Sequence, residues 1–118
     1  MSSRPSPRAL IGLAVLVLAA SAGSGWWAQR QQQDIGREVA ARVRPGDLRM
    51  LSSTTCSICV TARLWFTEHR VSFTECFIEN DTACAAEFAA TRSPGTPVLL
   101  VRGVPQVGFN PQRLRDSL

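Results

Sequence analysis

The sequence has no lysine and no tyrosine, and it contains a single histidine, His69. All 13 basic residues are therefore arginines, and the 118-residue chain carries a net charge of +4. These arginines are scattered along the chain, whereas clustered basic residues mark a nucleic-acid-binding surface. We therefore expect a solvated basic surface and no nucleic-acid partner. His69 lies near the end of a helix-patterned stretch, so we interpret it as a favourable charge at a helix C-terminus rather than as a catalytic base.

Charged residues are also absent from residues 9–28. About twenty uncharged residues are just enough to span a bilayer, and Trp26 and Trp27 would then lie at the lipid–water interface. The same stretch also fits a cleaved export signal, because residues 20–22 match the small-residue pattern of a cleavage site. In both cases the arginines before the stretch keep the start of the chain in the cytoplasm. The following domain is expected to be membrane-anchored or exported, outside the cytoplasm, and periplasmic if the source is a Gram-negative bacterium.

Composition divides the chain into three parts. Residues 1–28 are the signal anchor or signal peptide, and residues 29–46 are polar and rich in glutamine and arginine. Apolar residues in this second part recur at every fourth position, which predicts a polar helical stalk or linker with one narrow apolar stripe. Residues 47–118 then have the length of one small domain. The stripe consists of Ile35, Val39 and Val43.

Two cysteines, Cys56 and Cys59, stand between a short apolar run and a helix-patterned stretch. At the first turn of a helix, free backbone N–H groups and the helix dipole favour negative charge, so the thiolate of Cys56 is stabilised. Cys59, one turn later, is close enough to attack a mixed disulfide formed on Cys56. Thiolate attack on a client disulfide, followed by displacement by the second thiol, makes the pair a candidate catalytic centre of a thiol–disulfide oxidoreductase.

The other two cysteines, Cys76 and Cys84, lie across a predicted strand-to-helix connection. We expect a structural disulfide between them, which suits a small exported domain. Two free buried thiols, or a second redox relay or metal site, are the alternatives. A four-cysteine metal-binding module is the rival function, but zinc sites usually pair two short cysteine knuckles and this chain has one, so we expect no metal. A non-catalytic, membrane-anchored adaptor is a third interpretation.

The remaining pattern alternates strands and helices. The second predicted strand is nearly continuous in apolar character, which is typical of a central strand buried on both faces. Arg102 and Gly103 form a two-residue hairpin connection, and Pro105 assigns the last strand to the sheet edge. Asn110 and Pro111 mark the start of the last helix. Strands are predicted at residues 48–52, 71–78, 98–101 and 104–107, and helices at residues 60–70, 83–92 and from 111.

Residues 47–118 resemble a glutaredoxin, a member of the thioredoxin-fold superfamily. The resemblance implies an α/β fold with the order β-α-β-α-β-β-α and a four-stranded mixed sheet, here preceded by an N-terminal hydrophobic helix. It also implies that Pro97 is in the cis form and faces the dithiol. The matching motifs are Cys56-Ser57-Ile58-Cys59, Val71-Ser72-Phe73-Thr74-Glu75, Thr96-Pro97 and Val107-Gly108-Phe109.

The resemblance further implies partners and binding residues. Free amides at the start of the last helix could hold a carboxylate, such as one from glutathione, although capping with Phe109 in the core explains the same residues. The lysine usual before the motif is Ser53 here, and the acidic residue usual at the last helix is Asn110. We therefore expect a monomer with no bound cofactor, acting on disulfide-containing proteins, with glutathione as a candidate co-substrate. The expected substrate-binding residues are Thr55, Ser57, Ile58, Thr96, Pro97, Gly108, Phe109 and Asn110.

Overall fold

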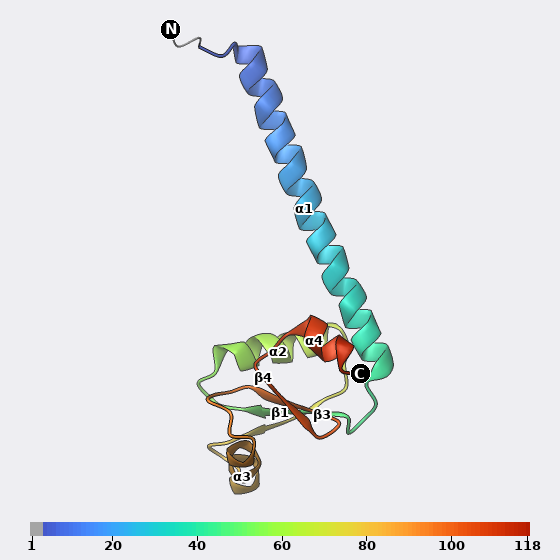
Figure 1. The fold of residues 1–118 in the computed structure, drawn as a ribbon, viewed down its shortest axis with the longest axis vertical. Helices are drawn as coiled ribbons and strands as arrows, with labels where there is room; N and C mark the ends of the chain where they lie inside the picture. Colours follow the sequence, from blue (N-terminus) through green and yellow to red (C-terminus); the bar gives the residue numbers. More distant parts are fainter. Residues whose placement is uncertain (1–3) are drawn as a thin grey trace. The chain divides into compact units, whose positions relative to one another are not determined.

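The computed structural model describes residues 4–118, so residues 1–3 of the predicted signal segment lie outside the described residues. The chain divides into two units, residues 1–32 and residues 33–118. Helix α1, Pro7–Arg42, begins in the first unit and ends in the second (Figure 1). An 18-residue window of α1 has a mean hydropathy of 1.9, so the helix is long and apolar enough to cross a membrane. The expected N-terminal hydrophobic helix is thus confirmed, although an export signal has the same length and composition.

The second unit is built on a four-stranded mixed sheet with the order β2-β1-β3-β4. Strand β1, Leu48–Ser52, pairs in parallel with β2, Thr74–Phe77, and antiparallel with β3, Val98–Val101. Strand β3 also pairs antiparallel with β4, Val104–Val107, whose Pro105 lies at the sheet edge as expected. Because β1 and β2 are parallel neighbours, their carboxyl ends meet at the same edge of the sheet.

Three further helices complete the predicted order. Helix α2, Ser57–Glu68, follows β1, α3, Thr82–Ala90, joins β2 to β3, and α4, Pro111–Asp116, follows β4. Figure 1 shows α2 and α4 on one side of the sheet and α3 on the other. The side chains of Asp81 and Asn110 cap α3 and α4 by accepting backbone N–H groups, and the predicted start of the last helix at Asn110 is confirmed. The β-α-β-α-β-β-α order and the α/β class are therefore confirmed.

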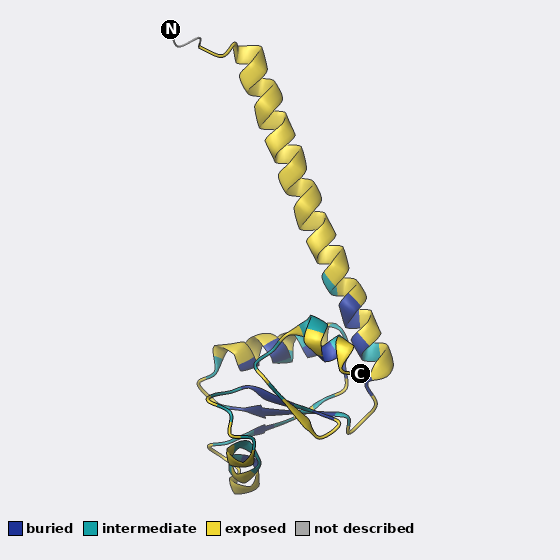
Figure 2. Ribbon diagram, viewed as in Figure 1, coloured by how far each residue is buried: buried dark blue, intermediate teal, exposed yellow. Residues whose placement is uncertain are grey.

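Each side of the sheet has its own hydrophobic core. The larger core includes Phe66 of α2, Leu114 of α4 and the predicted stalk stripe. Ile35, Val39 and Val43 of that stripe are 1%, 0% and 7% exposed, so the end of α1 is part of the folded unit (Figure 2). The predicted domain start at residue 47 stays a prediction, but the compact second unit begins at Gln33. The smaller core lies under α3 and consists of Leu51, Cys76, Cys84 and Val98, with Ile78, Phe88 and Leu100 packed against it.

The prediction that the second strand is central was wrong. Strand β2 has four residues and stands at the sheet edge, and only Cys76 among them is buried. The apolar residues before the strand, Val71 and Phe73, belong to the connection from α2 and pack into the larger core. Ile78, after the strand, packs against the smaller core. The continuous apolar character therefore arose from residues that pack into two different cores rather than from one strand buried on both faces.

Candidate functional site

The dithiol lies at the junction of β1 and α2. Cys56 is the N-cap residue of α2, and its Sγ accepts the backbone N–H of Cys59 at 3.0 Å. The two cysteines form a disulfide, with a Cα–Cα distance of 5.3 Å. Cys56 is half-buried, whereas Cys59 is 0% exposed. An incoming group can therefore reach the sulfur of Cys56, while the sulfur of Cys59 stays beneath it.

A short loop presents Cys56 at the carboxyl end of the central strand. In open α/β sheets, binding sites form outside the carboxyl ends of the strands, where connections diverge to the two faces. The backbone N–H of Cys56 donates to the carbonyl of Ser53 at 3.4 Å, which closes a turn between β1 and α2. The sheet thus fixes the start of the loop, and the first turn of α2 fixes its end.

An open depression surrounds Cys56. Its lining includes Ser53, Thr55, Ser57 and Ile58 from the segment around Cys56, and Thr96 from the loop before β3. The structure therefore brings four of the expected binding residues together at the dithiol, and none of the lining side chains is charged. Ile58 is 51% exposed, so an apolar side chain stands beside the reactive sulfur.

Pro97 follows Thr96 and is joined to it by a cis peptide bond, so the expected cis form is confirmed. The proline side chain is fully buried, and its carbonyl accepts the backbone N–H of Gly108 at 2.8 Å. Gly108 has a φ of +79°, a conformation that glycine adopts without steric cost. Gly108 thus holds the backbone of Pro97, which follows the depression-lining residue Thr96.

Phe109 and Asn110 lie outside the lining of the depression. The ring of Phe109 packs on Trp65 and Phe66, with centroid distances of 5.5 Å and 5.4 Å. The Asn110 Oδ1 accepts the backbone N–H of Arg113 at 2.9 Å and caps α4. Core packing and capping therefore account for both residues, and their role in binding a substrate carboxylate stays a prediction.

Glu79 is a polar contact of the site that the sequence pattern did not single out. Its carboxylate accepts a hydrogen bond from the Ser53 hydroxyl and lies 3.2 Å, through either oxygen, from the backbone nitrogen of Thr54. The hydrogen bond from Ser53 lowers the pKa of Glu79 below its ordinary value, and that from Thr54 adds to this effect. The signal was topological, because Glu79 follows the carboxyl end of a strand parallel to β1.

A second carboxylate joins α2 to the sheet. Glu75 of β2 accepts two hydrogen bonds from Arg63, at 2.7 Å and 3.0 Å, and one from the Ser52 hydroxyl at 2.9 Å. The hydrogen bond to Glu75 raises the pKa of Arg63. Ser52 is fully buried, so this network satisfies a polar group that would otherwise be costly inside the protein. It fixes the helix that carries the dithiol against β1 and β2.

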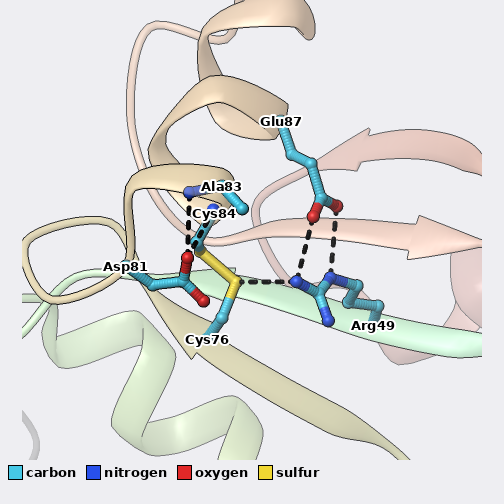
Figure 3. A network of polar contacts seen from close by, with 6 residues as sticks. All are labelled: Arg49, Cys76, Asp81, Ala83, Cys84 and Glu87. Atoms are coloured by element: carbon cyan, nitrogen blue, oxygen red, sulfur yellow. Dashed lines mark hydrogen bonds and ion pairs between the residues drawn. A yellow bond between two sulfur atoms is a disulfide. The ribbon is translucent and has the colours of Figure 1, made fainter.

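Cys76 and Cys84 form a second disulfide, which joins β2 to the first turn of α3. Both residues are buried, at 8% and 0% exposure. Arg49 donates to both carboxylate oxygens of Glu87, at 3.2 Å and 3.0 Å, and one of its nitrogens lies 3.5 Å from the Cys76 sulfur (Figure 3). The ion pair therefore lies directly beside the disulfide. Within residues 4–118, no group of three or more histidine, cysteine, aspartate or glutamate side chains is placed to hold a metal ion.

No protein-family model and no curated protein matches the sequence. Among solved structures, a mutant of a thioredoxin-like protein matches with a TM-score of 0.56 at 19% identity, over 60% of this chain and 92% of the other. A wheat glutaredoxin matches with a TM-score of 0.48 at 16% identity, over 74% of this chain and 83% of the other. The first likeness, together with the order of strands and helices, shows the fold: this chain carries the thioredoxin fold, the superfamily fold that its glutaredoxin-like motifs imply.

Proposed function

We propose that this protein is a thiol–disulfide oxidoreductase with Cys56 and Cys59 as its reacting pair. The observation that carries the proposal is the accessible Cys56 sulfur at the N-terminus of α2, bonded to a buried Cys59 in a thioredoxin fold. A structural cysteine would be expected in the interior, as Cys76 and Cys84 are, at 8% and 0% exposure.

The reaction follows from this geometry. In the reduced protein, the N–H of Cys59 and the start of α2 stabilise the thiolate of Cys56. The thiolate attacks one sulfur of a client disulfide, and the client's other sulfur leaves as a thiolate that takes up a proton. Cys59 then loses its proton and attacks the Cys56 sulfur, which releases the second client thiol and forms the Cys56–Cys59 disulfide. Two electrons pass from the dithiol to the client, and the reverse sequence oxidises a client dithiol.

Charge around the dithiol favours a protein client over glutathione. Glutathione carries two carboxylates, which bind best to cationic groups or free helix amides. The side chains that line the depression are uncharged, and the nearby carboxylate of Glu79 adds negative charge. The exposed Ile58 offers an apolar contact to an extended polypeptide passing Cys56. Glutathione remains a candidate co-substrate.

Cysteine substitutions in the full chain test the proposal. Cys59→Ser should trap a mixed disulfide with a client, whereas Cys56→Ser should trap none, because the attacking sulfur is absent. In the reduced protein, Cys56 should reach half of its maximal alkylation rate at a pH below about 8.5, the value for an unperturbed thiol. Alkylation with the profile of an unperturbed thiol, and no captured client, would contradict the proposal. Native mass spectrometry that finds a metal on four free thiols would instead support the metal-binding alternative.

We also place the catalytic domain outside the cytoplasm, attached to the membrane or released after export. The uncharged residues 9–28 within α1 support this proposal, as do two disulfides in a small domain, which persist best in an oxidising compartment. A client in that compartment would be a secreted or membrane protein with its cysteines on the same side.

A further inference from the structure

The carboxylate of Glu79 joins the loop after β2 to the loop that presents Cys56. It accepts hydrogen bonds from the hydroxyl of Ser53 and from the backbone of Thr54, which lie 26 and 25 residues away in sequence. Ser53 in turn lines the depression around the dithiol, and its carbonyl accepts the N–H of Cys56 at 3.4 Å. One exposed side chain therefore reaches the turn from which the reactive cysteine projects.

The side-chain contacts within the turn itself are long. The remaining side-chain contacts of Ser53 and Thr55 are with each other, at 3.4 Å, and are long for hydrogen bonds between such groups. Within the described part of the chain, the side-chain contacts that reach the turn from another element are the hydrogen bonds that Ser53 and Thr54 donate to Glu79.

The second disulfide fixes the loop that carries Glu79. Cys76 and Cys84 close a segment with a sequence separation of 8, and Glu79 lies inside it. On one side of Glu79, the N–H of Ile78 donates to the Ser52 carbonyl at 3.0 Å, and on the other side Asp81 caps α3. Helix α3 also packs on the smaller core, and its Glu87 forms an ion pair with Arg49 of β1; the disulfide is the covalent link between the start of α3 and β2.

We propose that Glu79 is a positioning residue for the dithiol, and that the Cys76–Cys84 disulfide acts on Cys56 by holding Glu79 against Ser53 and Thr54. This inference rests on the proposed oxidoreductase function and assigns to the second disulfide a role in that reaction. Glu79 lies outside the lining of the depression around Cys56, and its hydrogen bonds go to Ser53 and Thr54, so we assign its effect to the loop and to its charge.

The tether and the charge of Glu79 have opposite effects. The tether orders the loop and thereby aligns Cys56 for attack. The negative charge, which is hydrogen-bonded to residues three and two positions before Cys56, disfavours its thiolate, since like charges repel. Because hydrogen bonds lower the pKa of Glu79, its carboxylate stays ionised across neutral pH. Both effects are therefore present together where exchange occurs.

Two substitutions separate these effects. Glu79→Gln removes the charge but keeps an oxygen that accepts hydrogen bonds from Ser53 and Thr54, whereas Glu79→Ala removes both. In the full chain, both variants should lower the pH of half-maximal alkylation of Cys56 by a few tenths of a pH unit. Exchange with a disulfide substrate should stay near the wild-type rate in Glu79→Gln and fall about tenfold in Glu79→Ala. The control is Glu68→Gln, because Glu68 is exposed and its carboxylate has no partner within residues 4–118.

The disulfide is tested by Cys76→Ser together with Cys84→Ser, made in the wild-type and Glu79→Ala backgrounds. If the disulfide acts through Glu79, the pair of substitutions should slow exchange several-fold in the first background and have little further effect in the second. Thermal melting of each variant identifies any that fails to fold, and the comparison of Glu79→Gln with Glu79→Ala then decides alone.

Equal exchange rates and equal alkylation profiles in wild type, Glu79→Gln and Glu79→Ala would overturn the inference. Fully additive effects of the disulfide and of Glu79→Ala would overturn the role of the disulfide. If the wild-type protein catalyses exchange and the variants exchange at the same rate, the inference about Glu79 fails but the oxidoreductase function is retained. A wild-type protein without exchange refutes that function itself.

Discussion

The sulfur of Cys56 occupies the position where a helix usually has an oxygen of serine, threonine, aspartate or asparagine. It accepts the Cys59 N–H at 3.0 Å and is also the accessible atom of the disulfide. One residue therefore begins α2 and presents the reactive atom to solvent. Because serine is also a good N-cap, Cys56→Ser should remove the chemistry and leave the helix start intact.

His69 shows how a single residue acquires its role from its neighbours. It is the C-cap residue of α2, near the helix end as expected, and its ring lies 4.5 Å from the ring of Trp65. A Cβ atom added at Gly36 of α1 would lie 2.2 Å from its Nδ1. Gly36 is therefore the site where the backbone of α1 approaches a side chain of α2.

This contact predicts the effect of Gly36→Ala. Alanine normally stabilises a helix interior by about 1 kcal/mol relative to glycine. Here the new methyl group would displace the His69 ring from its packing on Trp65, and such overpacking costs about 1–3 kcal/mol. We expect a lower free energy of unfolding, measured by urea denaturation of the full chain in detergent.

The control for Gly36→Ala is the same substitution made in a His69→Ala background. With the ring removed, the methyl group has room, so the second substitution should be neutral or stabilising. A loss of stability that is equal in both backgrounds would mean that the two residues do not compete for space.

Among the elements, α1 has the least expected role. Its last turns supply Ile35 and Val39 to the larger core, and Val43 follows directly after the helix, so a polar segment with a narrow stripe completes the domain. Helix α3, in contrast, contributes little to a core. In the described structure its buried residue is Cys84, and the disulfide to Cys76 adds a covalent link to the sheet.

Two truncated chains test the contribution of α1. A chain that begins at Gln33 keeps the three buried side chains, whereas a chain that begins at Asp47 lacks them. Each buried aliphatic side chain contributes about 1.5–3 kcal/mol, so the shorter chain should lose about 5 kcal/mol or more. That loss is comparable to the whole stability of a small domain, which is about 5–15 kcal/mol. We expect the shorter chain to be largely unfolded by circular dichroism, and equal melting temperatures would show that residues 33–46 are a linker.

The whole molecule combines an apolar helical segment with a thioredoxin fold. In the first unit, the apolar side chains of residues 10–18 and both tryptophans, Trp26 and Trp27, are exposed, as a membrane-embedded segment requires. The apolar segment and the dithiol therefore belong to different units of one chain.

Fractionation and labelling of intact cells test the proposed location. The full chain should stay in the membrane pellet after carbonate extraction, because its uncharged segment is long enough to span the bilayer. After mild reduction, a membrane-impermeant thiol reagent should label Cys56 in intact cells, with Cys56→Ser as the control. A soluble protein shortened near residue 22 would identify the cleaved signal, and labelling that requires cell lysis would contradict the extracytoplasmic location.

Local signals in the sequence determined much of this protein. Strands β1, β3 and β4 have the predicted bounds, because short β-branched and aliphatic runs stop at turn residues. Arg102 and Gly103 have φ values of 49° and 82° in the predicted hairpin connection, and Asn110 caps α4. The C-x2-C motif at a strand–helix junction identified the dithiol for the same reason: its residues lie within one turn of each other along the chain.

Only the tertiary structure decided which segments meet across the sheet. The edge position of β2, the burial of Ile35 in the larger core and the reach of Glu79 to Ser53 each depend on residues far apart in sequence. Hydrophobic periodicity indicates that a residue is buried but not which partner buries it. The sequence therefore determined the Cys56–Cys59 pair and its local geometry, and the packing of distant elements decided what surrounds and holds that pair.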